Sequence, residues 1–151
     1  MTETTDHLPA STTAVTVPPG HGRELAAGST RPTVKVGPHN GSHLIGMLES
    51  ELPPGSGFPG HVHDDYEEVF YVLAGEIQYL IDNDWTPASA GSTVFIPPGR
   101  VHAFRNAGDE PARHLAIASP ADAMTMIEEA LQADPPARSA VFARYRSHLV
   151  D

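Results

Sequence analysis

The sequence predicts an all-β domain of short strands, followed by one or two short helices. Between residues 33 and 118, runs rich in Val, Ile, Leu, Phe and Tyr alternate with turns of Gly, Pro, Asp and Asn. This rhythm is typical of a barrel or a sandwich. Beyond residue 119, apolar residues recur at helical spacing instead. A chain of 151 residues is long enough for one such domain with a sizeable core.

The strands are expected in regular succession, each bounded by turn residues. They are predicted at residues 33–36, 43–52, 68–73, 76–81, 91–96 and 112–118. Between the last two, Pro97-Pro98-Gly99 predicts a rigid corner that delivers His102. The chain is therefore expected to divide into an N-terminal arm at 1–20, a barrel at 21–118 and a helical segment at 119–151.

The C-terminal segment is predicted to contain two helices. Ser119 is the expected N-cap of the first, with Pro120 at its first helical position. The apolar stripe of this helix is expected to pack on the outside of the barrel and consists of Met124, Ile127 and Leu131. The second helix is predicted to begin at Asp134-Pro135-Pro136, and its stripe consists of Val141, Phe142, Tyr145 and Leu149.

Charge and composition narrow the classes of partner. The sequence has 9 basic and 19 acidic residues and a net charge of −10, which disfavours nucleic acid and anionic membranes. It has no cysteine, so imidazole and carboxylate groups are the available metal ligands. No basic region followed by an apolar run opens the sequence, and no stretch approaches the ~20 apolar residues of a membrane span. We therefore expect a cytoplasmic protein.

Two glycine-framed blocks contain three histidines and a glutamate at defined spacing. The first reads Gly55, five residues, His61-Val62-His63, four residues, Glu68, six residues and Gly75. The second reads Gly91, five residues, Pro97-Pro98-Gly99, two residues, His102, three residues and Asn106. Because successive side chains of a strand point to opposite faces, His61 and His63 project the same way, as two ligands of one metal must. Glu68 and His102 would complete a site of nitrogen and oxygen ligands.

Strand alternation also separates two adjacent acids. Glu68 shares a face with Phe70 and Val72, whereas Glu67 lies on the opposite face. The spacing to the following glycine favours Glu68 as the residue that points at the metal. Glu67 is expected to be a surface or inter-subunit acid.

The two blocks resemble the two motifs of the cupin superfamily, and every fixed position of both patterns is filled. The resemblance implies a double-stranded β-helix, the jelly-roll barrel of that superfamily. Residues 20–131 are also similar to single-domain cupins related to quercetin dioxygenases. The stretches that carry this similarity are Gly22-Arg23, Thr33-Val34-Lys35-Val36, Leu52-Pro53-Pro54-Gly55, Phe70-Tyr71-Val72-Leu73 and His102-Ala103-Phe104-Arg105-Asn106.

The resemblance implies a metal held by His61, His63 and His102, with Glu68 as a ligand and as the acceptor of a flavonol hydroxyl proton. One divalent transition metal per chain is expected, at roughly 2.0–2.2 Å from the histidine nitrogens. Fe, Ni, Co, Mn, Cu or Zn all suit such ligands. From the residues alone, Glu68 is either the fourth ligand or a general base.

The wall of the site is expected to be apolar. From strand parity, the candidates for this wall are Phe58, Phe70, Val72, Phe95 and Phe104. For each of them, packing in the core without a role in the site is the alternative. Two further histidines, His43 and His114, lie on predicted strands. They are expected to support a ligand or to lie on the surface, but either could supply a fourth nitrogen if Glu68 moved away.

Three classes of function stay open. The overall resemblance favours a metal-dependent dioxygenase acting on a small phenolic or enolic substrate. Small monocupin cyclases of aromatic polyketide biosynthesis share the metal spacing and an apolar pocket, so a non-redox cyclase or isomerase is the first alternative. A small-molecule-binding cupin without catalysis is the second. A homodimer is expected, because cupin barrels often pair and the N-terminal arm and the Tyr145 stripe otherwise have no partner.

Overall fold

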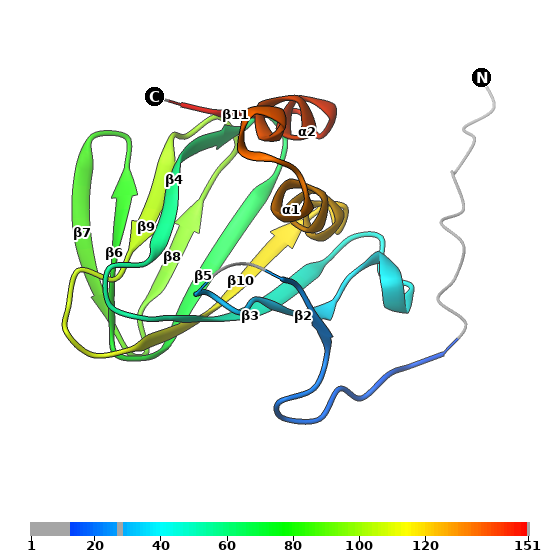
Figure 1. Cartoon of the computed structure of the whole chain (residues 1–151). Coiled ribbons are helices and arrows are strands. Elements are labelled where there is room, and N and C mark those ends of the chain that lie inside the picture. Colours follow the sequence, from blue (N-terminus) through cyan, green and yellow to red (C-terminus); the bar gives the residue numbers. More distant parts are fainter. Residues whose placement is uncertain (1–12, 27–28, 151) are drawn as a thin grey trace, which may run out of the picture.

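The chain forms two facing antiparallel sheets with two helices at one end (Figure 1). The structure, a computed structural model, describes residues 13–26 and 29–150. Of the expected N-terminal arm, residues 1–12 lie outside the described part, and residues 13–20 form no helix or strand. The predicted all-β jelly-roll barrel with short C-terminal helices is confirmed.

The barrel consists of a six-stranded and a five-stranded sheet. The six-stranded sheet has the order β1 (Arg23–Glu24), β2 (Thr33–Val36), β3 (Gly46–Leu52), β10 (Ala112–Ser119), β5 (Glu67–Ala74) and β8 (Thr93–Ile96). The five-stranded sheet has the order β11 (Ser147–Leu149), β4 (Gly57–His63), β9 (His102–Arg105), β6 (Glu76–Ile81) and β7 (Asp84–Ser89). Neighbours such as β3 and β10 are far apart in the sequence, so long-range pairing builds both sheets.

Alternation along the six-stranded sheet separates a buried inner face from an exposed outer face. On β5, Glu68 and Phe70 point inward and are 8% and 2% exposed, whereas Glu67 and Tyr71 point outward. The inward residues of β10 are small except for His114, and the others are Ala112, Ala116 and Ala118. The period-two pattern of the sequence therefore places the acid of the first block inside the barrel.

The first helix begins later than expected. Helix α1 spans Ala123–Gln132 with Asp122 at its N-cap, so the prediction of Ser119 as N-cap and Pro120 as the first helical residue is wrong. Ser119 is the last residue of β10 and pairs with Glu67 of β5. The strand ladder continues through this residue, and its pairing outweighs the local preference of serine for a cap.

The helices cover one end of the barrel rather than its outside. Helix α1 lies beside helix α2 (Arg138–Arg144), and the 3-10 helix η2 (Pro135–Ala137) connects them (Figure 1). Their apolar side chains border the cavity inside the barrel through Met126, Ile127, Leu131 and Phe142. The expected packing of the α1 stripe on the outer surface is therefore wrong.

The chain ends in a strand that the sequence did not predict. Helix α2 ends at Arg144, and β11 then pairs with β4 through Ser147 opposite His63 and Leu149 opposite His61. Leu149 therefore belongs to a strand and not to the predicted helical stripe. Three residues are too few for a period-two pattern to be recognised, so only the neighbouring strand defines β11.

The start of β3 also differs from the prediction. Residues 43–45 precede the strand, which begins at Gly46, and the 3-10 helix η1 (Pro38–Asn40) lies further upstream. His43 is exposed on a bend in this connection. The prediction that His43 lies on a strand is therefore wrong.

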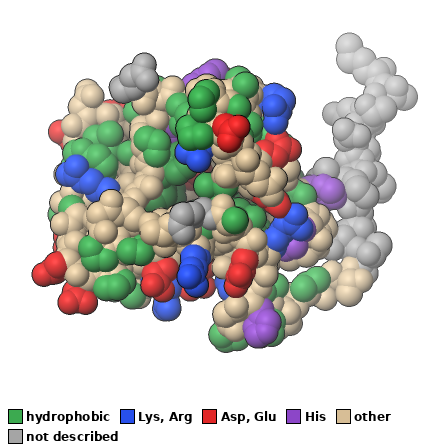
Figure 2. Space-filling model, viewed as in Figure 1, with side chains coloured by type: hydrophobic (Ala, Val, Ile, Leu, Met, Phe, Trp, Pro, Cys, Tyr) green, Lys and Arg blue, Asp and Glu red, His purple; other side chains and the backbone are tan. Residues whose placement is uncertain are grey.

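Basic side chains on the surface form intramolecular ion pairs. Arg23 contacts Glu128 at 2.6 Å, and Lys35 contacts Glu49 at 3.9 Å. On the face shown in Figure 2, Lys and Arg side chains are scattered among acidic and uncharged ones. Within the described residues, no helix has the length and apolar character that a membrane crossing requires.

Candidate metal centre

Three histidines and one glutamate meet inside the barrel. The ligand atoms of His61, His63, Glu68 and His102 all lie within 4.8 Å of one another, and all four residues are buried. Two of them come from β4, one from β5 and one from β9, so both sheets contribute. The structure thus brings together the four residues that the two sequence blocks singled out.

A bulge in β4 turns both a histidine and a phenylalanine toward the interior. Phe58 pairs with Phe104 and His61 pairs with His102, so β4 has one more residue than β9 between these pairs. One extra residue in a strand reverses its side-chain alternation. Phe58 and His61, an odd number of positions apart, therefore both border the cavity.

The Pro-Pro-Gly corner holds β9 against β4. Gly99 has a φ of 81°, a left-handed conformation that glycine adopts without a steric penalty. Its N–H donates a hydrogen bond to the carbonyl of His63 at 2.7 Å. The corner that precedes His102 is thereby tied to the strand that carries the other two histidines.

Asn106 ends the second block as a structural residue. It is 1% exposed, and its side-chain amide donates to the carbonyls of Leu52 and Glu110, both at 2.8 Å. Its Oδ1 accepts a hydrogen bond from the N–H of Gly108 at 3.0 Å. Its buried amide is therefore satisfied while it fastens the end of β9 to β3 and to the following turn.

Backbone carbonyls orient two of the histidine rings. Nδ1 of His61 lies 2.9 Å from the carbonyl of Pro59, and Nδ1 of His102 lies 2.9 Å from the carbonyl of Arg100. A carbonyl can only accept a hydrogen bond, so each Nδ1 carries a proton. In the neutral ring, Nε2 is then the nitrogen left to bind a metal.

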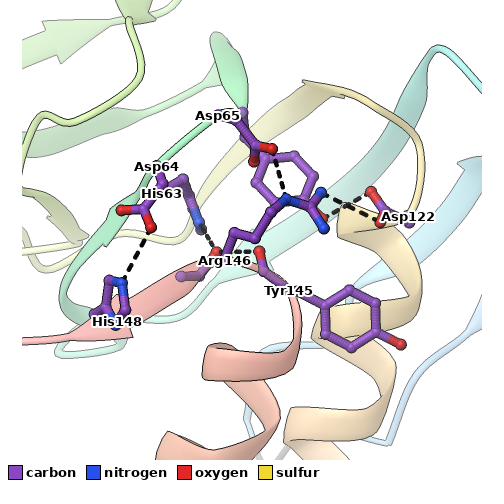
Figure 3. Close-up of polar contacts among 9 residues, drawn as sticks. His63, Asp64, Asp65, Asp122, Tyr145, Arg146 and His148 are labelled. Carbon is purple, nitrogen blue, oxygen red and sulfur yellow. Dashed lines mark hydrogen bonds and ion pairs between the residues drawn. The ribbon is translucent and has the colours of Figure 1, made fainter.

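The C-terminal strand orients the third histidine. The hydroxyl of Ser147, a fully buried residue, donates to the carbonyl of Tyr145 at 3.0 Å and lies 2.6 Å from Nδ1 of His63 (Figure 3). Because the hydroxyl has donated its own proton, it accepts from Nδ1 and leaves Nε2 for the cluster. Sequence analysis missed Ser147, since no local pattern marks it as a neighbour of His63.

Arg146 fastens β11 beside the site. Its guanidinium contacts the carboxylates of Asp65 at 2.5 Å and Asp122 at 3.6 Å (Figure 3), and it lies 5.5 Å from the ring centre of Tyr66. Its carbonyl accepts a hydrogen bond from the N–H of Asp64 at 2.9 Å. These contacts join β11 to the loop after β4 and to the start of α1.

The histidines keep the carboxylate of Glu68 ionised. Burial by itself would raise the pKa of Glu68, but the hydrogen bonds from His102 and His63, together with their charge, hold that pKa far below its usual range. Oε2 of Glu68 lies 2.6 Å from Nε2 of His102 and 3.4 Å from Nε2 of His63. Glu68 therefore carries its negative charge at neutral pH.

The same carboxylate affects the histidines unequally. Burial opposes protonation of His102, but its hydrogen bond to Glu68 and the charge of Glu68 prevail and raise its pKa. His61 has no such bond, and burial with the neighbouring charge of His102 lowers its pKa to about 3. The carboxylate of Glu68 therefore stabilises positive charge at this end of the cluster.

This donor set fits a divalent transition metal. Three imidazole nitrogens and one carboxylate oxygen converge, and the partners at Nδ1 leave Nε2 of each ring for coordination. His61, His63 and His102 would hold the ion, with Glu68 as the fourth ligand. Nitrogen and oxygen ligands of this kind suit Fe, Ni, Co, Mn, Cu and Zn alike.

Three of the four cluster residues, His61, His63 and Glu68, border a partly open apolar cavity. Of the predicted wall residues, Phe58, Phe70 and Phe104 border this cavity. Strand β3, strand β10 and the two helices supply further apolar side chains that strand parity had not selected: Leu48, Leu52, Ala116, Met126, Ile127, Leu131 and Phe142.

Two predicted wall residues lie elsewhere. Phe95 is 53% exposed, because it pairs with Val69 of β5 and shares the outer face of the sheet. Val72 is fully buried on the inner face of β5, but it belongs to the main core and not to the cavity wall. Parity within one segment cannot set the register between segments, so it assigned Phe95 to the wrong face.

The two additional histidines have different surroundings. His43 is exposed outside the barrel, so the prediction that it could replace Glu68 is wrong. His114 is 1% exposed on β10 and borders the cavity, but it lies outside the four-residue cluster. Nδ1 of His114 lies 2.8 Å from the hydroxyl of Tyr79.

Known proteins share this domain. Residues 48–118 match the Cupin domain family. A stretch of 79 residues, 52% of the chain, is 32% identical to the oxalate-binding protein of Thermotoga maritima and covers 64% of that protein. A stretch of 69 residues, 46% of the chain, is 36% identical to polyketide synthase CurC of Streptomyces cyaneus and covers 45% of it.

A solved structure with the same architecture is the polyketide cyclase RemF from Streptomyces resistomycificus. It aligns with a TM-score of 0.56 and 26% identity, over 64% of this chain and 69% of that one. The chain thus spans less than two thirds of the length of the curated relatives described above, whose names point to different ligands. The family match, the two facing sheets and the converging histidines agree. The chain therefore contains a cupin domain, at residues 48–118.

Proposed function

We propose that the chain is a metal-dependent enzyme that acts on a small aromatic molecule with a phenolic or enolic oxygen. The observation that carries this proposal is the opening of a buried four-ligand cluster onto a cavity with aromatic and aliphatic walls. Such walls favour a flat apolar ligand, and a cation-binding cluster beside them favours an ionisable oxygen on that ligand.

Glu68 is the residue that we assign to proton transfer. Its carboxylate is buried and ionised, and it lies at the edge of the cavity. A divalent ion in the cluster would supply Lewis-acid stabilisation of negative charge on a substrate oxygen. Glu68 would accept the proton of that hydroxyl, while Phe58 and Phe104 hold the ring and exclude water.

Among the possible reactions, we favour a non-redox cyclisation or isomerisation of a polyketide-like substrate. The similarity to CurC and RemF, both named for polyketide chemistry, supports this choice. A dioxygenase is the second candidate. The observation that favours it is the set of three histidines and one glutamate, which would leave two positions of a six-coordinate ion for other ligands.

Metal analysis combined with dioxygen uptake distinguishes the two reactions. The protein is expressed with Fe, Co, Ni, Mn, Cu and Zn supplied, and we expect about one bound ion per chain. Zinc without dioxygen uptake in the presence of 3-hydroxyflavone and naphthols would support the non-redox reaction. A redox-active ion with uptake would support the dioxygenase. Absence of any bound ion, in a folded protein, would contradict both.

We also propose that the protein is a homodimer. On the outer face of β5 and β8, Tyr71 is 40% exposed and Phe95 is 53% exposed. Exposed apolar groups on one face are typical of protein interfaces. A second copy of the chain is the partner we expect there. Light scattering at micromolar concentration should give the mass of two chains, and Phe95→Glu should give the mass of one. A single-chain mass for the wild type would contradict the proposal.

A further inference from the structure

A second polar pair lies on the cavity wall, apart from the metal ligands. His114 of β10 and Ser50 of β3 are cross-strand partners, and both border the cavity. They are 1% and 7% exposed. Apart from Thr30, the remaining described wall residues outside the metal cluster are apolar or glycine. This pair therefore interrupts an otherwise apolar surface.

Tyr79 determines which nitrogen of His114 carries the proton. The Tyr79 hydroxyl is 2.8 Å from Nδ1 of His114 and belongs to a residue that is 2% exposed. It has no second partner in the described part of the chain, so Nδ1 is the acceptor within its reach and we assign the hydroxyl as the donor. Burial lowers the pKa of His114 to about 4, so the ring is neutral at pH 7 and carries its own proton on Nε2.

Nε2 of His114 and the hydroxyl of Ser50 both face the cavity. Neither atom has a hydrogen-bond partner within the described residues. In the same residues, however, no fully enclosed side-chain nitrogen or oxygen is left without a partner. Both atoms must therefore reach the cavity surface, where Nε2 offers a donor and the hydroxyl offers a donor and an acceptor.

The ring of Phe70 neighbours both His114 and the metal cluster. Its centroid lies 5.4 Å from that of His114 and 6.4 Å from that of His102. The His114 ring stacks on Phe70 with 25° between their planes, and it meets Phe104 edge-on at 4.8 Å. These contacts fix the plane of the imidazole. We expect a ligand of two or three fused rings to extend along Phe70 from one polar end of the cavity to the other.

We infer that His114 and Ser50 form a subsite that binds an oxygen of the substrate remote from its metal-binding oxygen, with Tyr79 as a positioning residue. This inference rests on the proposed function. The ligand class is a fused aromatic molecule with an ionisable hydroxyl at one end and a carbonyl or hydroxyl oxygen at the other. A buried polar atom without a partner is unfavourable, so the pair selects against ligands that lack the second oxygen.

Two naphthols test the subsite. 2-Naphthol has one hydroxyl, and 2,6-dihydroxynaphthalene has a second one at the far end of the same rings. The full chain is loaded with Co(II), whose visible spectrum reports a ligand at the ion, and the Kd of each probe is measured by calorimetry. We expect the diol to bind roughly fivefold to tenfold more tightly than 2-naphthol. The ratio of the two Kd values is the readout, because general damage to the fold affects both probes.

Four variants assign this ratio to the two residues. His114→Leu and Ser50→Ala should each reduce it, and His114→Leu should bring it close to two, the statistical value for a diol whose two hydroxyls are equivalent. His114→Gln retains an N–H donor and should keep part of the preference. His21→Leu makes the same change at an exposed histidine and should keep all of it. A wild-type ratio of two or less, or an unchanged ratio in His114→Leu, would overturn the inference.

Tyr79→Phe tests the positioning role through the ring nitrogens of His114. By ¹⁵N NMR, we expect the proton on Nε2 in the wild type and a mixture of both tautomers in the variant. The ratio of Kd values should fall roughly twofold to threefold in this variant, since the donor is present for part of the time. A wild-type ring with its proton on Nδ1 would overturn the assignment.

The outcomes separate the subsite from the proposed function. If 2-naphthol shifts the Co(II) spectrum and the Kd ratio is two or less, the subsite is refuted while phenol binding at the metal stands. If neither naphthol shifts the spectrum up to its solubility limit, the proposed function and the subsite are both refuted.

Discussion

Two groups of buried histidines share this barrel, and their immediate partners differ. His61, His63 and His102 surround the carboxylate of Glu68, whereas Nδ1 of His114 lies 2.8 Å from the phenol hydroxyl of Tyr79. Burial disfavours the charged ring at His61, His102 and His114. At His102 the bond to Glu68 and its charge outweigh burial and raise the pKa, whereas at His114 burial lowers the pKa to about 4.

This difference shows that burial alone does not decide what a histidine does. The first group combines electron-pair donors with a negative charge, so a proton or a cation is stabilised there. The second group has no ion pair, so its ring stays neutral and offers a fixed N–H to the cavity. We therefore expect the partners of the histidines to distinguish a metal-binding end of the cavity from a ligand-binding end.

The largest difference between the two groups should appear in metal binding. His61→Ala or His102→Ala removes a ligand and should abolish metal binding. In the wild type we expect about one bound ion per chain. His114→Ala removes an equally buried histidine that is no ligand, and it should keep the ion. Elemental analysis of the purified variants measures this. Full metal content in His102→Ala, or loss of the ion in His114→Ala, would contradict the division.

The next largest effect should come from the charge within the first group. Glu68→Gln keeps the size of the side chain but removes its basicity, so we expect retained metal and a fall in turnover of roughly 10²-fold or more. Turnover is measured on a substrate found in the phenol screen. Glu67→Gln is the matched control, because Glu67 points to the outer face, and it should change turnover little. The reverse result would show that Glu67, and not Glu68, transfers the proton.

The stability of the fold should depend on pH through His114, the histidine of the second group. The pKa of His114 is about 4 in the folded chain against an ordinary value of 6.5, so between these values only the unfolded chain is protonated. Stability is therefore lost as pH falls from 6.5 towards 4. Between pH 7 and pH 5 we expect a loss of about 2 kcal/mol through this residue. The free energy of unfolding is measured in urea on the metal-free proteins at both pH values. Its change with pH should be smaller by this amount in His114→Leu than in the wild type, and an equal change in both proteins would contradict the assignment.

The smallest effect should come from the partner of a ligand rather than from a ligand. Ser147→Ala removes the acceptor that orients His63, and we expect metal affinity to fall roughly tenfold, as for other supporting partners. Competition with a chelator measures the affinity. Ser89→Ala, at an exposed position, is the control and should leave it unchanged. Wild-type affinity in Ser147→Ala would show that β11 does not orient the ligand.

Local spacing within the two blocks, together with their resemblance to the two cupin motifs, was sufficient to predict the four residues of the metal cluster. The alternation of β4 gives His61 and His63 a common face, and the alternation of β5 separates Glu68 from Glu67. The corner at residues 97–99 sets the short distance along the chain to His102. Each of these relations involves residues within a few positions of one another, so the sequence alone could express it.

The cavity wall could not be predicted in the same way. Phe95 lies outside because β8 pairs with β5 in one particular register, and Phe58 lies inside because β4 contains a bulge. Met126 and Phe142 reach the cavity because α1 and α2 cover the end of the barrel. Each of these placements depends on how one segment meets another.

The sequence by itself determined the strand rhythm, the facing of Glu68 and the common face of His61 and His63, because turn preference and the two-residue period act within a single segment. Only the tertiary structure decided that Ser147 supports His63 and that His114 lies beside Ser50 on the cavity wall. These pairs join strands separated by long stretches of chain. Their register is chosen by the packing of the whole barrel, which no local pattern contains.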